Sequence, residues 1–117
     1  MELHTRNCIP CRGDTPPLTA EEREGLHQSL DQGWKIVDGH HLERNFRLPN
    51  FQSALDLVNQ VGAIAEEQDH HPDLELGWGR VGIKIWTHAI DGLTESDFVL
   101  AAKIDQVPVP SPKEKSE

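Results

Sequence analysis

The most regular pattern in the chain lies between residues 51 and 68, where apolar side chains recur every three or four positions. The members of this stripe are Phe51, Ala54, Leu55, Val58, Val61 and Ala65. Such spacing predicts an amphipathic helix with one buried face. Asn50 is a favourable N-cap residue, and Pro72 disfavours helical backbone at the residue before it. We therefore expect a central helix from about residue 51 to Gln68.

Before this helix, the pattern changes to one that is typical of strands. Residues 34–38 are rich in aromatic and β-branched side chains, and residues 42–48 alternate between two faces. One face of the second segment carries Leu42, Arg44, Phe46 and Leu48. Gly39 and His40 are turn candidates between the two segments, so a first hairpin is expected here.

A second hairpin is expected after the central helix. Residues 74–78 and 81–88 flank Gly79 and Arg80, which we interpret as a turn. In the later strand, one face carries Val81, Ile83, Ile85 and Thr87, and the other carries Gly82, Lys84, Trp86 and His88.

Two capping signatures predict shorter helices near the ends of the chain. Thr19 with Glu22 forms a capping box for a helix that we expect to end near Gly33. Thr94 with Asp97 begins the last helix in the same way. The apolar positions are Leu26 and Leu30 in the first of these helices and Phe98, Ala101 and Ile104 in the last.

The resulting order is α-β-β-α-β-β-α, which favours an α+β fold with a four-stranded antiparallel sheet and helices packed on one face. A chain of 117 residues suits a single domain. We expect residues 1–17 to form an N-terminal arm and residues 18–106 to form the domain. Residues 107–117 are rich in proline and charge and are expected to be a flexible tail without core material.

Charge and hydropathy exclude several classes of function. The formal net charge is -9 and no cluster of lysine or arginine occurs, which argues against nucleic-acid binding. The longest apolar runs are well short of the roughly 20 residues that cross a membrane. Residues 1–7 lack the apolar core of a signal peptide, so we expect a cytoplasmic protein.

Cys8 and Cys11 form a single Cys-x-x-Cys pair. A structural zinc site needs four ligands, and here His4, or the distant His40 and His41, would have to complete the set. The favoured interpretation is two reduced surface thiols in a flexible arm, without a metal. For His40 and His41, in a turn, the favoured interpretation is solvent-exposed side chains without a role.

Three histidines in the second half are the main candidates for chemistry. His70 and His71 precede Pro72, where the central helix has to stop, and His88 ends a predicted strand. The helix end is also acidic, with Glu66, Glu67 and Asp69 opposing the helix dipole. The residues alone leave open metal binding, acid–base catalysis and a purely structural helix end.

A longer pattern favours the catalytic interpretation. Glu66-x-x-x-His70-His71-Pro72, followed by Trp78, His88 and Asp97 at their spacings, resembles the signature of the pterin-4a-carbinolamine dehydratases. The segments 79–81, 86–88 and 92–98, and also Cys8-x-x-Cys11, are similar to bacterial members of that family. The resemblance covers about residues 8 to 105. The family's fold, a four-stranded antiparallel sheet backed by helices, agrees with the order above.

The resemblance implies dehydration of 4a-hydroxytetrahydrobiopterin to quinonoid dihydropterin and water by histidine acid–base catalysis, without a cofactor or metal. It implies His70 and His88 as an acid–base pair and His71 as a pterin contact or second acid. The implied orienting or substrate-binding residues are Glu66, Asp69, Pro72 and Thr87. Asp97 matches the motif too, but its place in the capping box favours a structural role. Leu74 stands where many relatives have an aromatic residue.

The resemblance also implies partners and one alternative function. Relatives form dimers or tetramers, and open sheet edges invite pairing, so we expect a homo-oligomer. A link to an aromatic amino acid hydroxylase pathway follows from the substrate. The alternative is a non-enzymatic role on the same fold, as a transcription coactivator or an assembly factor for a carbon-fixing enzyme. The presence of His70, His71 and His88 together favours the enzyme.

Overall fold

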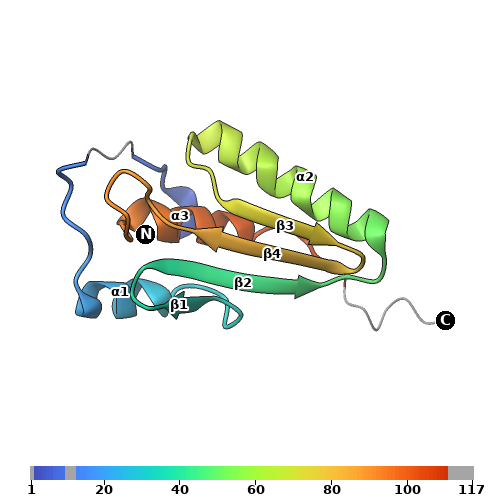
Figure 1. Cartoon of the computed structure of the whole chain (residues 1–117), viewed down its shortest axis with the longest axis horizontal. Coiled ribbons are helices and arrows are strands. Elements are labelled where there is room, and N and C mark those ends of the chain that lie inside the picture. The colour runs from blue at the N-terminus through green and yellow to red at the C-terminus, as the bar shows by residue number, and fades with distance from the viewer. Residues whose placement is uncertain (1, 10–12, 111–117) are drawn as a thin grey trace.

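The computed structural model describes residues 2–9 and 13–110 of the chain (Figure 1). In chain order the elements are the 3-10 helix η1 (Leu3–Thr5), α1 (Ala20–His27), β1 (Lys35–Val37), β2 (His41–Arg47), α2 (Phe51–Gln68), β3 (Asp73–Gly77), β4 (Arg80–Ile85) and α3 (Glu95–Ile104). Cys11 and the tail from residue 111 lie outside the described residues. Among the described helices, none is long and apolar enough to span a membrane.

The four strands form one antiparallel sheet in the order β1-β2-β4-β3, which confirms the predicted α+β fold. β1 pairs with β2 in the first hairpin, and β3 pairs with β4 in the second. The pairing of β2 with β4 joins the two hairpins. The inner face of the sheet is buried and carries Leu42, Phe46, Val81, Ile83 and Ile85. These side chains share one core with Leu57 and Val61 of α2 and Phe98 and Ile104 of α3. The helices therefore cover one face and leave the other face of the sheet open.

All three predicted helix starts are confirmed. Thr19 forms a capping box with Glu22, and the Asn50 side chain accepts the backbone N–H of Ser53. Asp97 accepts the backbone N–H of Thr94 at the start of α3. Local side-chain to backbone bonds of this kind depend only on neighbours in sequence, which is why the sequence predicts them well.

Two helices differ in detail from the expectation. α1 ends at His27 instead of near Gly33, and Leu30 packs into the core from beyond the helix. In α2 the buried positions are Ala54, Leu57, Val61 and Ala65, whereas Phe51 is 45% exposed. Phe51 is the first residue of α2, and this end of the helix lies beside the β3–β4 turn (Figure 1). The apolar periodicity predicted the position of α2 correctly, but the residues that it assigned to the buried face differ in part from those that are buried.

The second hairpin turns one residue earlier than predicted. Gly77 pairs with Arg80, so Trp78 and Gly79 form the turn, and Gly79 adopts a φ of 68° that favours glycine. β4 ends at Ile85 instead of His88. Thr87 nevertheless remains tied to the sheet end through an isolated bridge with Gly92.

The chain ends contribute more to the fold than the sequence suggested. Leu3 in the N-terminal segment is only 5% exposed, and the Lys103 ammonium donates a hydrogen bond to the carbonyl of His4 at 2.9 Å. Val107 and Val109 pack against the core, so the expectation that nothing after residue 106 contributes core material is wrong for these two. The contact between Lys103 and His4 joins positions that are 99 residues apart.

A half-buried carboxylate links the first hairpin to the end of α3. Asp105 accepts hydrogen bonds from the Trp34 indole at 2.7 Å, the Arg44 guanidinium at 2.8 Å and the Asp31 backbone at 2.9 Å. Burial raises the pKa of the Asp105 carboxyl above its usual value, and these hydrogen bonds offset part of the rise.

Candidate active site

The end of α2 turns the chain sharply and brings both adjacent histidines out of the helix. Asp69, the C-cap residue, has left-handed backbone angles (φ 53°, ψ 43°), and its N–H bonds to the carbonyls of Ala65 and Glu66. Aspartate tolerates this conformation better than most residues. The side chain of Asp69 is exposed. The feature of Asp69 that builds the site is therefore its backbone turn.

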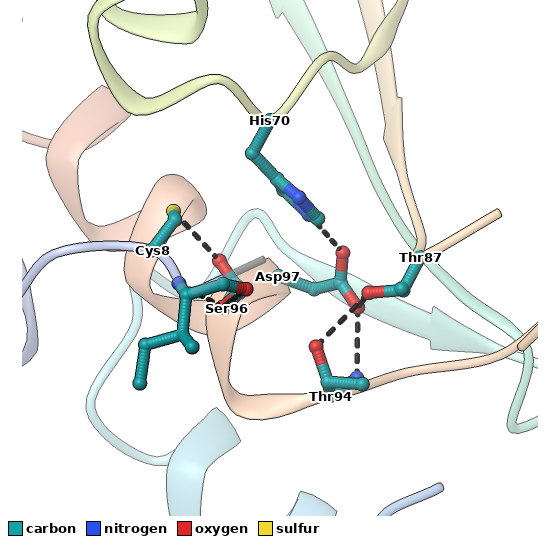
Figure 2. Close-up of polar contacts among 7 residues, drawn as sticks. Cys8, His70, Thr87, Thr94, Ser96 and Asp97 are labelled. Atoms are coloured by element: carbon teal, nitrogen blue, oxygen red, sulfur yellow. Dashed lines mark hydrogen bonds and ion pairs between the residues drawn. The ribbon is translucent and has the colours of Figure 1, made fainter. Parts of the chain in front are cut away.

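His70 points inward, to the start of α3. Its Nε2 lies 2.6 Å from Oδ1 of Asp97, a carboxylate with no exposed surface (Figure 2). The other carboxylate oxygen, Oδ2, accepts the Thr87 hydroxyl at 2.8 Å and the backbone N–H of Thr94 at 2.8 Å. An ionised carboxylate can only accept hydrogen bonds, so beside an ionised Asp97 the contact requires the tautomer of His70 with its proton on Nε2. His70 then carries its proton on Nε2 and leaves Nδ1 for other chemistry.

Asp97 therefore serves two elements at once. It caps α3, as its place in the capping box predicts, and it also holds His70. The prediction of a structural role for Asp97 was incomplete, because a capping box is recognised from neighbouring residues alone. His70 is 27 residues away from Asp97 in the sequence. Thr94 was likewise missed as part of this network. Its hydroxyl lies 2.9 Å from that of Thr87, which already donates to Asp97, so Thr94 donates.

His71 and Glu66 form a second histidine–carboxylate pair on the outside of the same junction. His71 Nε2 lies 2.6 Å from Glu66 Oε2, and the side chains are 52% and 79% exposed. Solvent screens such an exposed pair, so it contributes little to stability. The pair places an imidazole with a fixed orientation at the surface, next to Pro72.

His88 follows Thr87 at the end of the sheet, and its side chain is exposed. Its ring packs edge-on against Trp86, with 4.5 Å between ring centroids. The end of β4 lies beside the end of α2, since Thr87 and His70 bind the same carboxylate. The polar partner of His70 is Asp97, and the ring partner of His88 is Trp86.

His40 and His41 are half-buried, so the interpretation of both as solvent-exposed turn residues is wrong. His40 Nε2 lies 2.7 Å from Asp91 Oδ1, and the Nδ1 atoms of the two histidines are 3.0 Å apart. Both rings also lie against Trp86, at 5.3 Å and 5.9 Å between centroids. Trp86 thus connects this pair to His88, a contact that a local reading of the turn could not predict.

The open face of the sheet contains a cavity of about 400 Å³. Its lining includes Pro72 at one end and Glu43, Asn45, Glu75 and Lys84 on the strands. Gly82 forms part of the floor, because a Cβ atom there would lie 3.0 Å from the Asn45 side chain. Leu74 also lines this cavity. The substrate-contact candidate Pro72 therefore joins the histidine junction to this open face.

The cysteine expectation changes in one respect. Cys8 is half-buried, and its thiol lies 3.4 Å from the Ser96 carbonyl (Figure 2), so it is not a surface thiol in a mobile arm. Within residues 2–9 and 13–110, no group of three or more histidine, cysteine or acidic side chains is arranged to hold a metal ion.

Comparison with known proteins agrees with this architecture. The family described as pterin 4 alpha carbinolamine dehydratase matches residues 16–107. A protein of Rubrobacter xylanophilus is 58% identical over 106 residues, covering 91% of this chain and 98% of its own. One of Alkaliphilus metalliredigens is 49% identical over 104 residues, covering 89% and 94%. Both are named, provisionally, as pterin-4-alpha-carbinolamine dehydratases.

A solved structure gives the same result. The crystal structure of a transcriptional coactivator/pterin dehydratase from Brucella melitensis superimposes with a TM-score of 0.71 at 34% sequence identity. The match covers 76% of this chain and 95% of the Brucella chain. Sequence and fold together show that this chain belongs to the pterin-4a-carbinolamine dehydratase family.

Proposed function

We propose that this protein catalyses the loss of water from a 4a-hydroxytetrahydropterin, giving quinonoid dihydropterin. The observation that carries the proposal is the 2.6 Å contact between His70 and the buried carboxylate of Asp97. His71 follows His70 directly, and Thr87, the residue before His88, bonds to the same carboxylate. An imidazole fixed in this way is suited to moving a proton at neutral pH. Membership of the family supplies the substrate class.

The reaction requires two proton transfers. The bond between C4a and the hydroxyl oxygen breaks, and the oxygen leaves with the electron pair and takes up a proton. The neighbouring ring nitrogen loses its proton, and its electrons form the new double bond to C4a. A general acid and a general base are needed, each within hydrogen-bond reach and each contributing roughly 10²–10⁴-fold.

We assign the base to His70. Asp97 holds Nε2–H, so Nδ1 is the nitrogen that can accept the ring proton. When it does so, the positive charge forms beside a desolvated carboxylate, which stabilises the charged imidazole. The proton for the departing hydroxyl then comes from His71 or His88, whose rings are more exposed.

The remaining candidates take supporting roles in this proposal. Thr87 is buried and its hydroxyl is bonded to Asp97, so it would orient the carboxylate and not the pterin. Glu66 would orient His71. Pro72 and Asp69 would shape the approach to the histidines, with the flat pterin ring packed over an apolar wall.

The direct test is a stopped-flow measurement of dehydration of a 4a-hydroxypterin generated in place by a hydroxylase. We expect the purified protein to accelerate the reaction and to do so equally well after treatment with a chelator. His70→Gln should lose most of the acceleration. A wild-type protein that leaves the spontaneous rate unchanged would refute the proposal and favour the non-enzymatic binding role.

A further inference from the structure

The N-terminal segment from Arg6 to Ile9, here called the strap, lies across the two helix ends that carry His70 and Asp97. It is outside residues 16–107, the part of the chain that the family description matches. Figure 1 shows the N-terminal segment beside α3, and Figure 2 shows the contact of Cys8 with Ser96, the residue before Asp97. Polar side chains at the end of α2 and at the start of α3 bind the strap.

On the α2 side, the strap binds the carboxamide of Gln68 at both of its polar atoms. The backbone N–H of Cys8 donates to Gln68 Oε1 at 2.7 Å. The Gln68 amide nitrogen donates to Asn7 Oδ1 at 3.3 Å. Gln68 is the last residue of α2 and stands two positions before His70. Its side chain is therefore fixed close to the point where the catalytic histidine leaves the helix.

On the α3 side, the strap binds Ser96, which directly precedes Asp97. Ser96 is 5% exposed, and its hydroxyl accepts the N–H of Ile9 at 2.8 Å and donates to the Ile9 carbonyl at 3.2 Å. An ion pair of 2.8 Å between Arg6 and Glu95 adds to the same attachment. The strap thus reaches the first turn of α3 at Glu95 and Ser96, the two residues that directly precede Asp97.

The two attachments act on a contact that spans separate elements. His70 belongs to the end of α2 and Asp97 to the start of α3, and their hydrogen bond is 2.6 Å long. A shift of about 1 Å at such a contact is enough to reduce catalysis about 100-fold. The strap ties the helix ends together a second time, one or two residues away from this bond.

We propose that the strap, acting through Gln68 and Ser96, positions His70 against Asp97. Gln68 and Ser96 are positioning residues, since neither needs to touch the substrate. The consequence for turnover rests on the dehydratase function proposed above. The geometric part does not, because the His70–Asp97 bond can be observed directly.

The experiment compares Gln68→Met with Gln60→Met. Methionine keeps the length and apolar stem of glutamine but cannot make either hydrogen bond to the strap. Gln60 is the matched control: it lies on the same helix, is exposed, and bonds only to its own helix, at Asp56, among the contacts described. Ser96→Ala, with the exposed Ser29→Ala as its control, tests the other attachment. Gln68→Glu keeps the acceptor for the Cys8 N–H and should recover part of the effect.

Two readouts distinguish positioning from a general loss of stability. One is the ring N–H proton of His70 in ¹⁵N-histidine NMR spectra, assigned by its loss in His70→Gln. The other is kcat and KM for dehydration. In Gln68→Met and Ser96→Ala we expect the N–H signal to move upfield and exchange faster with water, with kcat lowered about 10- to 100-fold and KM little changed. Both controls should match the wild type.

The result that overturns the proposal is equally specific. An unchanged His70 N–H signal in Gln68→Met and Ser96→Ala would show that the strap does not set this contact, whatever happens to activity. A changed signal with an unchanged kcat would show that the strap has no catalytic consequence. If the wild-type protein does not dehydrate the pterin, the proposed function fails, and the NMR signal alone still decides whether the strap positions His70.

Discussion

Asp97 holds His70 at 2.6 Å and at the same time caps the helix from which it projects. One buried carboxylate therefore joins the stability of α3 to the orientation of an imidazole on α2. These two effects have different sizes, because helix caps contribute about 1 kcal/mol whereas proton transfer by a positioned residue contributes roughly 10²–10⁴-fold in rate. Substitutions at this site should separate them.

Asp97→Asn is the sharpest of these substitutions. Its amide oxygen can still accept from Thr87 and Thr94, but its NH₂ group would then face His70 and favour the opposite ring tautomer. We expect kcat to fall about 100-fold or more while the free energy of unfolding changes by about 1 kcal/mol. Stopped-flow kinetics and urea unfolding of the same samples measure the two. A variant with near wild-type kcat would remove Asp97 from the mechanism.

Thr87→Val tests the support behind the carboxylate. Valine has nearly the same shape as threonine, but it removes one donor to Asp97 and leaves the Thr94 hydroxyl without this acceptor. We expect a loss of about 1–3 kcal/mol in unfolding free energy, measured by urea denaturation. Thr87→Ser keeps the hydroxyl and serves as the control. Equal stability of the Val and Ser variants would contradict the role assigned to this hydroxyl.

His70 and His88 should behave as a unit if both transfer protons in the same step. We expect each alanine variant to depress turnover strongly and the double variant to lose much less than the sum, since catalytic groups that act together are non-additive. Fully additive losses would show that the two act independently, and a near wild-type His88→Ala would exclude His88 from the mechanism.

His40→Ala tests whether the half-buried ring of His40 affects the site. The His40 ring is bonded to Asp91 and packs against Trp86, which in turn carries His88. We expect His40→Ala to lower kcat by a factor of a few. His4→Ala, in the N-terminal segment and away from Trp86, is the control. Identical kinetics of the two variants would show that the His40 contact has no effect.

Asp105 should give the unfolding free energy a defined pH dependence. Because burial raises its pKa in the folded protein, the folded state keeps the Asp105 proton at pH values where the unfolded chain has lost it. The stabilisation from this group is complete below the unfolded pKa of 3.8 and is lost as the pH rises through the folded value. The wild type should therefore lose stability relative to Asp105→Asn over this range, as measured by urea unfolding at several pH values. A wild type that gains stability relative to Asp105→Asn as the pH rises over this range would contradict the shift.

Self-association remains a prediction. β1 and β3 are the edge strands of the sheet, and Leu76 and Trp78 at one edge are 36% and 69% exposed. Open edges with apolar side chains favour pairing between copies. We expect light scattering to give a dimer or tetramer at micromolar concentration. A mass near 13.1 kDa would show that the protein is a monomer.

The features that the sequence predicted best depend on short stretches of chain. Asn50 and Pro72 bound the central helix from both sides, and alternation along residues 42–48 and 81–85 is enough to define the buried face of the sheet. The second role of Asp97 could not be found in this way, because its cap is made with Thr94 while His70 comes from another element. Recognising it requires the packing of α2 against α3.

The same limit explains the errors at the chain start and at the first turn. The attachment of Cys8 to Gln68 joins positions 60 residues apart, and the pairing of His40 with Asp91 joins positions 51 apart. Neither produces periodicity or a local motif. Polar side chains in loops are usually solvated, so the sequence favoured that interpretation until the tertiary contacts were known.

The bare backbone at Gly82 offers a way to divide the molecule experimentally. The cavity on the open face of the sheet exists partly because this position has no side chain. An added methyl group would lie 3.0 Å from the side-chain oxygen of Asn45 and in ordinary contact with Glu75. Alanine at this one position would thus make the cavity shallower while leaving every histidine and the whole carboxylate network in place. A ligand that binds on that face would be displaced, whereas the binding of a ligand confined to the histidine junction would be unchanged.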